Sequence, residues 1–530
     1  MSDSVDLLIT GGTIVDGTGA PARPGTVVVV GERMRVLDAA GQEPPHVGRR
    51  IDATGKVVAP GFIDLHSHGG LVILAEPHHE PKVRQGVTTE IVGVDGNGFA
   101  PFERREDLLA FVEMDSGLDG RPDIDYDWNT VADYLARFDG AVSVNVGTLV
   151  GNSQLRIAAV GWDDVPADGT AIDRMRGILR DAMAEGAVGL SSGLDYPPGS
   201  YATTDELAAL TRTAGAAGGF YHSHVRYMLG DRYLDPFREA IEIGRRAGAP
   251  SHITHFYHRQ THPGGPEALL ALVDDARAEG LDVTFDMYPS EWASTRLLVQ
   301  LPGWIQAGGP TPLKQRLADR SARDRLRPEL SPAYTGPSGW SDVRLGAFRR
   351  PELLRWESRT VADVMAETGH DAVDVICDLL LAEDLGINQV TSGPWSETLR
   401  PFIVHPVGLV GTDSTFMEAK PSPRTYGSFP RILGQFVRDE GLLSLEEAMR
   451  KMTGAAAERL GLTQRGTIRD GAFADLVVFD PATVRSNATY DEPRQFPTGI
   501  DHVIVNGILV VDGGEHTGAT PGRGIRLGTD

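Results

Sequence analysis

Cysteine is almost absent from this 530-residue chain, which contains only Cys377. A single cysteine excludes an internal disulfide and any metal site built from several thiolates. No apolar run approaches the roughly 18 residues of a membrane-spanning helix, and the start, MSDSVDLL, lacks the basic and apolar regions of a signal peptide. We therefore expect a cytoplasmic protein with no membrane partner.

Positive charge is also scarce, because 50 lysine and arginine residues face 73 aspartate and glutamate residues, a net charge of −23. Binding of nucleic acid requires a basic surface, so this balance argues against a nucleic-acid partner. A hydrophobic content of 41% and a charged content of 23% are typical of a globular protein. Cys377 lies in the amphipathic helical pattern AVDVICDLLLAEDL, which predicts a buried structural thiol.

Between Gly61 and about Gly461, short apolar segments alternate with Ala-rich segments of helical periodicity. Eight apolar segments have the length of strands: GFIDLH, TTEIVGVD, VSVNVGTLV, AVGLSSG, GFYHSHV, SHITHFY, DVTFDMY and PVGLVGTD. Strands that alternate with helices indicate a parallel sheet, and eight such units predict an α/β fold of the (β/α)8 TIM-barrel type over residues 61–461. Its chemistry is expected at the C-terminal ends of the strands.

The seventh and eighth predicted strands are separated by about 115 residues, far more than one helix requires. We interpret residues 289–400 as an inserted helical lid region that forms a substrate wall over the barrel mouth. A scaffold role or an oligomer contact is the alternative, and the sequence leaves open whether the protein forms a homo-oligomer.

Both ends of the chain have a different pattern. Val- and Ile-rich runs broken by Gly and Asp fill the N-terminal segment, and FADLVVFDP and HVIVNGILVVDGG repeat this pattern near the C-terminus. We expect residues 1–60 and 462–530 to form one small β-sandwich domain, with everything else inserted between them.

Histidine and aspartate side chains follow the ends of the predicted strands. His66 and His68 in GFIDLHSH are two residues apart, so both rings point to the same side of a strand. Imidazole nitrogen with carboxylate oxygen suits Zn²⁺, and also Mn²⁺ or Fe²⁺. His78 and His79, in the loop PHHEP, have no partner at a useful spacing and are interpreted as surface residues. The other candidate ligands at strand ends are Asp95, His224, His255 and Asp413.

Strand periodicity leaves part of this assignment open. His222 and His224 share one face of a strand, so either is a candidate ligand. His252 and His255 are three residues apart and face opposite sides of a regular strand, so only one of them can point inward.

Several longer strings carry a family resemblance. VVAPGFIDLHSH, EGAVGLSSGLDYPPGSYATTDEL, GTDS, KPSPRTYGSFPRILG and FADLVVFDP occur in this order. Together they resemble the amidohydrolase superfamily and, within it, the N-acyl-D-amino-acid deacylase (D-aminoacylase) family. The resemblance runs from about residue 5 to about residue 515 and implies one or two Zn²⁺ ions.

The resemblance also implies a role for each matched residue. His66 and His68 match a pair that serves a second, weaker metal position, whereas His224 and His255 match the imidazoles that hold the tighter metal. Asp413 matches the aspartate that accepts the proton of the activated water. The residues that match those binding the substrate carboxylate are Arg424, Tyr288 and Ser294.

Three positions depart from the family pattern, and one of them is Asn152, which stands where histidine is more usual. Asp95 stands where the pattern often has a metal-binding cysteine; a carboxylate can bridge two metals as a thiolate does, but it is a harder ligand. Tyr257 stands where a lysine is common, so a substrate contact made there by a cation becomes one made by a hydroxyl. The chain has five lysines, and none lies between the second strand and the lid, which argues against a carboxylated-lysine metal bridge: Lys56, Lys82, Lys314, Lys420 and Lys451.

We therefore expect a metal-dependent hydrolase that cleaves the amide bond of N-acyl-D-amino acids. A metal held by Asp95, His224 and His255 would activate a water, and Asp413 would act as general base and then as general acid. The alternatives are an amidohydrolase that acts on another amide, a cyclic amide or a lactone, and a metal-free binding protein that kept the barrel.

Overall fold

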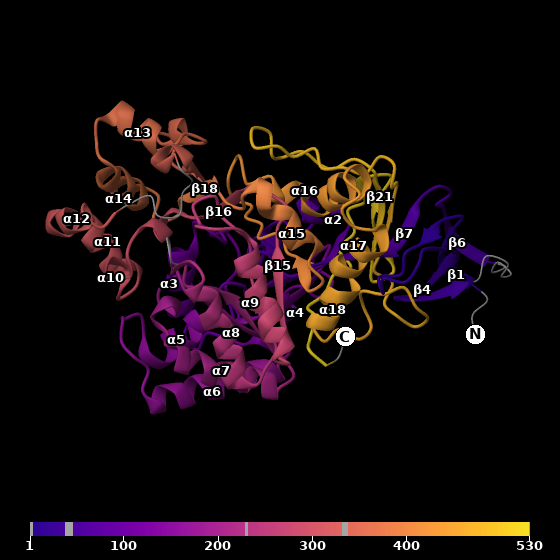
Figure 1. Cartoon of the computed structure of the whole chain (residues 1–530), viewed down its shortest axis with the longest axis horizontal. Coiled ribbons are helices and arrows are strands. Elements are labelled where there is room, and N and C mark those ends of the chain that lie inside the picture. Colours follow the sequence, from indigo (N-terminus) through magenta and orange to yellow (C-terminus); the bar gives the residue numbers. More distant parts are fainter. Residues whose placement is uncertain (1–3, 38–45, 228–231, 331–337, 529–530) are drawn as a thin grey trace.

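The computed structural model describes residues 4–37, 46–227, 232–330 and 338–528, and Figure 1 shows how its elements are arranged. A strand occurs at each of the eight positions predicted from the sequence, and the third position holds two short strands. These strands are β8 (Phe62–Asp64), β9 (Val87–Val92), β10 (Asn145–Thr148) with β11 (Val150–Gly151), β12 (Gly189–Gly193), β13 (Phe220–His224), β14 (Ser251–Ile253), β15 (Val283–Met287) and β19 (Gly408–Val410).

All pairings among these strands are parallel. Pairing runs from β8 through β9 to β10, and from β11 through β12, β13, β14 and β15 to β19. Only Leu149 separates β10 from β11. Beyond the ends of β8 and β19, Ser67 and Ser414 form an isolated parallel bridge. Nearly every residue of these strands is buried, as expected of parallel strands whose two faces are both covered.

Helices follow most of the strands and cover the sheet. Helix α7 begins where the Thr203 hydroxyl accepts a hydrogen bond from the backbone N–H of Glu206. No helix in the described part of the chain is long and apolar enough to cross a membrane. The helices before β15 are α1 (Val72–Ala75), α2 (Glu80–Val83), α3 (Arg105–Asp115), α4 (Val131–Ala136), α5 (Asn152–Val160), α6 (Gly169–Ala184), α7 (Thr204–Ala216), α8 (Asp235–Ala247) and α9 (Glu267–Ala278). Those after β15's insertion are α15 (Leu399–Val404), α16 (Arg424–Arg431), the π-helix Ile432–Asp439, α17 (Leu445–Met452) and α18 (Gly454–Arg459).

The segment between β15 and α15 has its own apolar core, which includes the buried Cys377. Burial raises the pKa of this thiol to about 12, in agreement with a structural role. The segment contains an antiparallel sheet of β16 (Trp292–Arg296), β18 (Asn388–Ser392) and β17 (Arg344–Gly346), which our sequence prediction of helices missed. Its helices α10 (Gly303–Gln306), α11 (Pro310–Ala318), α12 (Arg320–Leu326), α13 (Val361–Thr368) and α14 (Ala372–Ala382) lie at the upper left of Figure 1.

Strands from the two ends of the chain pair with each other. In a seven-stranded sheet, β7 (Val57–Pro60) pairs with β20 (Leu476–Phe479) and with β2 (Thr13–Ile14), and a four-stranded sheet lies beside it at the right of Figure 1. Apolar side chains of both sheets, such as Ile9, Val58 and Val478, form one buried cluster. The remaining strands are β1 (Ser4–Thr10), β3 (Arg23–Pro24), β4 (Thr26–Val30), β5 (Arg33–Leu37), β6 (His46–Asp52), β21 (Ile500–Val505), β22 (Ile508–Asp512) and β23 (Glu515–His516).

A buried ionic cluster holds the segment after β8 against the segment after β19. The Lys82 ammonium contacts a carboxylate oxygen of Asp64 and lies 2.6 Å from the Thr412 hydroxyl. The other oxygen of Asp64 accepts hydrogen bonds from the backbone N–H groups of His66 (3.1 Å) and Thr412 (2.9 Å). The prediction that His79 lies at the surface is wrong. It is 2% exposed, and its Nε2 lies 2.8 Å from an oxygen of Glu90 in the same cluster.

Replacement of Lys82 by methionine is expected to lower the free energy of unfolding by about 3–5 kcal/mol, because it leaves a buried carboxylate without its cation. The change would be measured as a lower midpoint of thermal unfolding. Lys314→Met is the matched control, since Lys314 forms partly exposed ion pairs with Glu113 and Asp384 and its loss should cost about 1 kcal/mol or less. Equal midpoints for the two variants would contradict the structural importance of Lys82.

Candidate metal centre

The six predicted ligands come together at the carboxyl ends of the parallel strands. They form two buried groups, and within each group the donor atoms all lie within 4.8 Å of one another. Asp95 belongs to both groups, whereas His222 belongs to neither. The first group is His66, His68, Asp95 and Asp413, and the second is Asp95, His224 and His255.

The second group has the donor chemistry of a zinc site. His224 Nδ1 and His255 Nε2 lie 2.9 Å apart, and Asp95 Oδ2 lies 3.2 Å from the first nitrogen and 3.5 Å from the second. Two imidazole nitrogens and a carboxylate oxygen that converge in this way fit a divalent transition cation, because three lone pairs then face one positive charge. The second group therefore fits a divalent metal ion.

The first group shares Asp95 with the second group and adds another carboxylate. His68 Nε2 lies 3.2 Å from Asp413 Oδ1 and 3.7 Å from Asp95 Oδ2. His66 Nε2 lies 3.5 Å from Asp95 Oδ2 and 3.6 Å from Asp413 Oδ1. These residues fit a second cation next to the first, with the Asp95 carboxylate between the two positions.

Three of the six residues have left-handed backbone conformations: φ is +54° at Asp95, +34° at His255 and +51° at Asp413. Such values are uncommon outside glycine and concentrate at functional sites. At His255 the positive φ also ends the alternation of the strand, because β14 stops at Ile253. The prediction that only one of His252 and His255 points inward assumed a regular strand through both residues, and this premise does not hold because His255 lies beyond β14. Both residues are buried, and both contact buried carboxylates.

Further polar side chains orient the imidazoles from behind, and our sequence reasoning did not identify them. Asp119 Oδ2 lies 3.1 Å from His68 Nδ1, and Asp195 Oδ2 lies 3.2 Å from His224 Nε2. The Tyr227 hydroxyl lies 2.7 Å from His255 Nδ1. Partners of this kind fix the tautomer and the ring orientation of a metal ligand. Asp195 is the second residue after β12, so its position near a strand end was an available signal; Asp119 lies in a loop and had none.

Arg424 is fully buried and contacts Asp413 directly. Its Nη1 lies 2.8 Å from Asp413 Oδ2, its Nη2 donates to the Ser294 carbonyl (3.1 Å), and the guanidinium lies over the Tyr288 ring at 4.2 Å. Burial raises the pKa of Asp413, but the positive charges of Arg424 and His66 outweigh that effect and bring it to about 2. Asp413 is therefore ionised at neutral pH, as a proton acceptor must be.

A cavity opens over the two groups, and the predicted substrate-binding residues Tyr257, Tyr288 and Ser294 line it. Tyr257 accepts a hydrogen bond from Arg259 (3.0 Å), and the Ser294 hydroxyl contacts Thr415 at 2.9 Å. Ser294 lies on β16, so the inserted antiparallel sheet supplies one wall of the cavity.

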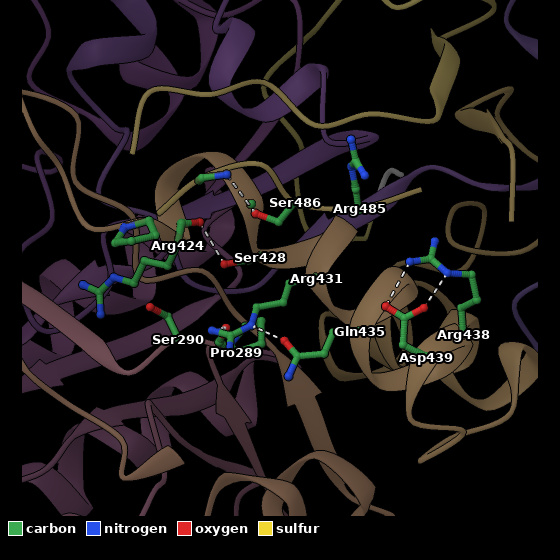
Figure 2. A pocket seen from close by; sticks show the side chains of 13 residues that line it. Pro289, Ser290, Arg424, Ser428, Arg431, Gln435, Arg438, Asp439, Arg485 and Ser486 are labelled. Atoms are coloured by element: carbon green, nitrogen blue, oxygen red, sulfur yellow. Dashed lines mark hydrogen bonds and ion pairs between the residues drawn. The ribbon is translucent and has the colours of Figure 1, made fainter. Parts of the chain in front are cut away.

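A larger cavity of about 460 Å³ lies on the other side of α16, away from the metal groups. Figure 2 shows Arg424, Arg431, Arg438 and Arg485 among the residues that line it, and the Arg424 carbonyl accepts a hydrogen bond from Ser428. None of the candidate metal ligands lines this cavity. The chemistry therefore belongs to the smaller cavity.

Known proteins share this sequence and this fold. The chain matches the amidohydrolase family model over residues 49–293 and 313–511. It is 35% identical to an N-acyl-D-glutamate deacylase of Alcaligenes xylosoxydans xylosoxydans over 96% of this chain and 94% of that one. It is 34% identical to a D-aminoacylase of the same organism over 98% of both chains. A solved structure of N-acyl-D-glutamate deacylase from Bordetella bronchiseptica, complexed with zinc and a phosphonate mimic of the tetrahedral intermediate, superposes with a TM-score of 0.81 at 31% identity, over 99% of this chain and 100% of that one.

Proposed function

The chain belongs to the amidohydrolase family, and from this membership we propose that it is a zinc-dependent hydrolase that cleaves N-acyl-D-amino acids to a carboxylate and a free D-amino acid. The observation that carries the proposal is that the two candidate metal groups share Asp95, and that Asp413 of the first group contacts the buried Arg424. Relatives that are deacylases of N-acyl-D-amino acids support the same substrate class.

Asp95, His224 and His255 would hold the tighter cation, and His66 and His68, with Asp95 and Asp413, the weaker one. When bound, such a cation supplies polarisation of the scissile carbonyl and a lower pKa for the attacking water. Asp413 then accepts the proton of this water. After the tetrahedral intermediate forms, Asp413 delivers the proton to the leaving nitrogen, so that the amine departs neutral.

Arg424, which contacts the cavity residue Asp413, would bind the substrate α-carboxylate through charge-assisted hydrogen bonds. Tyr288, Ser294 and Tyr257, which line the cavity, would be its neutral neighbours. A substrate fixed at its carboxylate and at its scissile carbonyl has two points of attachment. The wall provided by β16 supplies the third, which is what discrimination between D and L isomers requires.

Replacement of Arg424 by alanine is expected to raise KM for N-acyl-D-amino acids by about 10- to 100-fold, because a charge-assisted hydrogen bond contributes roughly 1.5–3 kcal/mol. A neutral N-acyl amine without a carboxylate serves as the comparison substrate, and its KM should change little. Arg424→Lys keeps the charge but loses the two-pronged geometry, so it should give an intermediate KM. Equal increases for both substrates would contradict the carboxylate-binding role.

A substrate panel with metal quantification tests the proposed function itself. We expect the purified protein to contain zinc and to hydrolyse N-acetyl-D-amino acids, with D-leucine, D-glutamate and D-aspartate derivatives included, at least about 100-fold faster than their L isomers. Turnover of cyclic amides or lactones alone would replace this function by another amidohydrolase activity. The absence of both bound transition metal and turnover would favour the alternative of a metal-free binding protein.

We further propose that the eight parallel strands close into a barrel over residues 61–461, with residues 289–400 as a wall over its mouth. The bridge between Ser67 and Ser414 supports closure at one seam, and the single residue between β10 and β11 supports continuity at the other. Residues 1–60 and 462–530 would then form the separate β-sandwich domain, a proposal supported by the pairing of β7 with β20.

A further inference from the structure

A second set of imidazoles lies in the interior, behind the metal groups. His222 precedes His224 by two residues on β13, so its side chain lies on the same face of the strand, one step further from the carboxyl end. The residue is fully buried, and among the described residues neither ring nitrogen of His222 has a hydrogen-bond partner. A buried imidazole of this kind is costly and requires an explanation.

The unpartnered ring of His222 faces a carboxylate and another imidazole. His222 Nε2 lies 3.9 Å from Asp286 Oδ2, and His66 Nδ1 lies 3.4 Å from the same oxygen. The donor atoms of these three residues all lie within 4.8 Å of one another. Ligands that sit about 2.0–2.2 Å from a tetrahedral zinc ion are about 3.3 Å apart, close to these separations.

We propose that His66 Nδ1, His222 Nε2 and Asp286 Oδ2 form an interior site for a divalent transition cation, zinc above all. Two imidazole nitrogens and one carboxylate oxygen favour such ions over Mg²⁺ and Ca²⁺, which prefer oxygen ligands alone. The site shares only His66 with the two groups at the cavity, and its other two ligands lie outside them, so it extends beyond the proposed deacylase function.

Asp286 is already oriented for this role by neighbouring groups. Its Oδ1 accepts a hydrogen bond from the His255 backbone N–H (2.8 Å), and its Oδ2 lies 3.0 Å from His252 Nε2. His252 Nδ1 in turn lies 2.7 Å from the Thr284 hydroxyl. Because a carboxylate oxygen has two lone pairs, Oδ2 can accept from His252 and bind a cation at the same time. His252 is then the partner that orients the ligand.

The interior site is coupled to the cavity through His66. A neutral imidazole has one free lone pair, so His66 binds a cation either inside, through Nδ1, or at the cavity, through Nε2. The interior site and the weaker cavity position are therefore alternatives. The group of Asp95, His224 and His255 does not contain His66 and is independent of this choice.

Anomalous diffraction from zinc-loaded crystals of the wild-type protein locates the ions directly. The expected result is a peak at the zinc edge within about 2.2 Å of His222 Nε2 and Asp286 Oδ2, in addition to one at Asp95, His224 and His255. A feature at the interior position that fits a water molecule and has no anomalous signal would overturn the proposal. The diffraction result does not depend on activity, so the interior site can be disproved without disproving the deacylase function, and the reverse.

Zinc retention in variants is a second test of the interior site. After prolonged dialysis against a chelator, His222→Leu should retain about one zinc ion per chain fewer than the wild type, because a buried ion exchanges slowly. His405→Leu removes another partly buried imidazole, whose Nε2 contacts Asp274 and which belongs to none of the metal groups, and it should leave retention unchanged. His222→Gln replaces the leucine variant if that variant does not fold, and equal retention in wild type and folded variant would overturn the proposal.

Discussion

Replacement of Asp413 by asparagine is expected to lower kcat by about 10²- to 10⁴-fold, because it removes the group that accepts the proton of water and returns it to the leaving nitrogen. The amide is nearly the same size as the carboxylate. Its oxygen can accept from Arg424 in place of Asp413 Oδ2 (2.8 Å), and its nitrogen then takes the place of Oδ1, which lies 3.2 Å from His68 Nε2. KM should therefore change less than kcat. Steady-state kinetics on an N-acetyl-D-amino acid would measure both constants.

The control for this variant is its metal content. The group of Asp95, His224 and His255 does not include Asp413, so the tighter cation should remain bound in Asp413→Asn. Loss of activity together with loss of that cation would mean that Asp413 acts through metal binding and not as the proton acceptor. Activity near that of the wild type, with zinc present, would remove Asp413 from the chemistry altogether.

The contact between Arg424 and Asp413 gives the Arg424 guanidinium two tasks. The guanidinium neutralises the carboxylate in the structure, and under the proposed function it also meets the substrate carboxylate. Binding of substrate would then draw part of the positive charge away from Asp413 and make it a stronger base when the substrate is in place. The consequence is that truncated substrates without the α-carboxylate should lose kcat as well as affinity.

The strand positions could be predicted because short segments with apolar and β-branched or aromatic residues alternate with segments of helical periodicity, as at β9 (VTTEIV) and β13 (FYHSH). The inserted sheet of β16, β17 and β18 escaped prediction because its antiparallel strands do not follow that alternation. WASTR and NQVTS mix polar and apolar residues, and their pairing joins segments about 90 residues apart. The local sequence does not reveal pairing between segments so far apart in the chain.

The ligands themselves were predictable because they stand at strand ends, where a parallel fold gathers side chains. Their orienting partners were not, since Asp119 and Tyr227 reach the imidazoles from loops. The error at His79 has a related origin. His79 is buried and contacts a carboxylate of β9, that of Glu90, which neither spacing nor periodicity reveals.

Replacement of Asp95 by alanine is expected to lower kcat/KM by about 10³-fold or more, because the metal contributes several kcal/mol of transition-state stabilisation and Asp95 serves both positions. Its Oδ2 lies between 3.2 and 3.7 Å from four imidazole nitrogens, those of His66, His68, His224 and His255. Zinc bound at both positions should therefore be weakened together. His68→Ala is the matched comparison, since it affects the weaker position alone and should keep the tighter ion.

A cysteine at the same position separates the bridging role from the identity of the donor atom. Asp95→Cys should restore zinc binding relative to Asp95→Ala, because a thiolate can also bridge two cations, and it should move the preference from Mn²⁺ toward softer ions such as Cd²⁺. Metal content and activity after reconstitution with each ion would measure this shift. If Asp95→Ala kept full zinc content at both positions, the carboxylate would lie near the metals without binding them, and the loss of activity would have to come from substrate positioning.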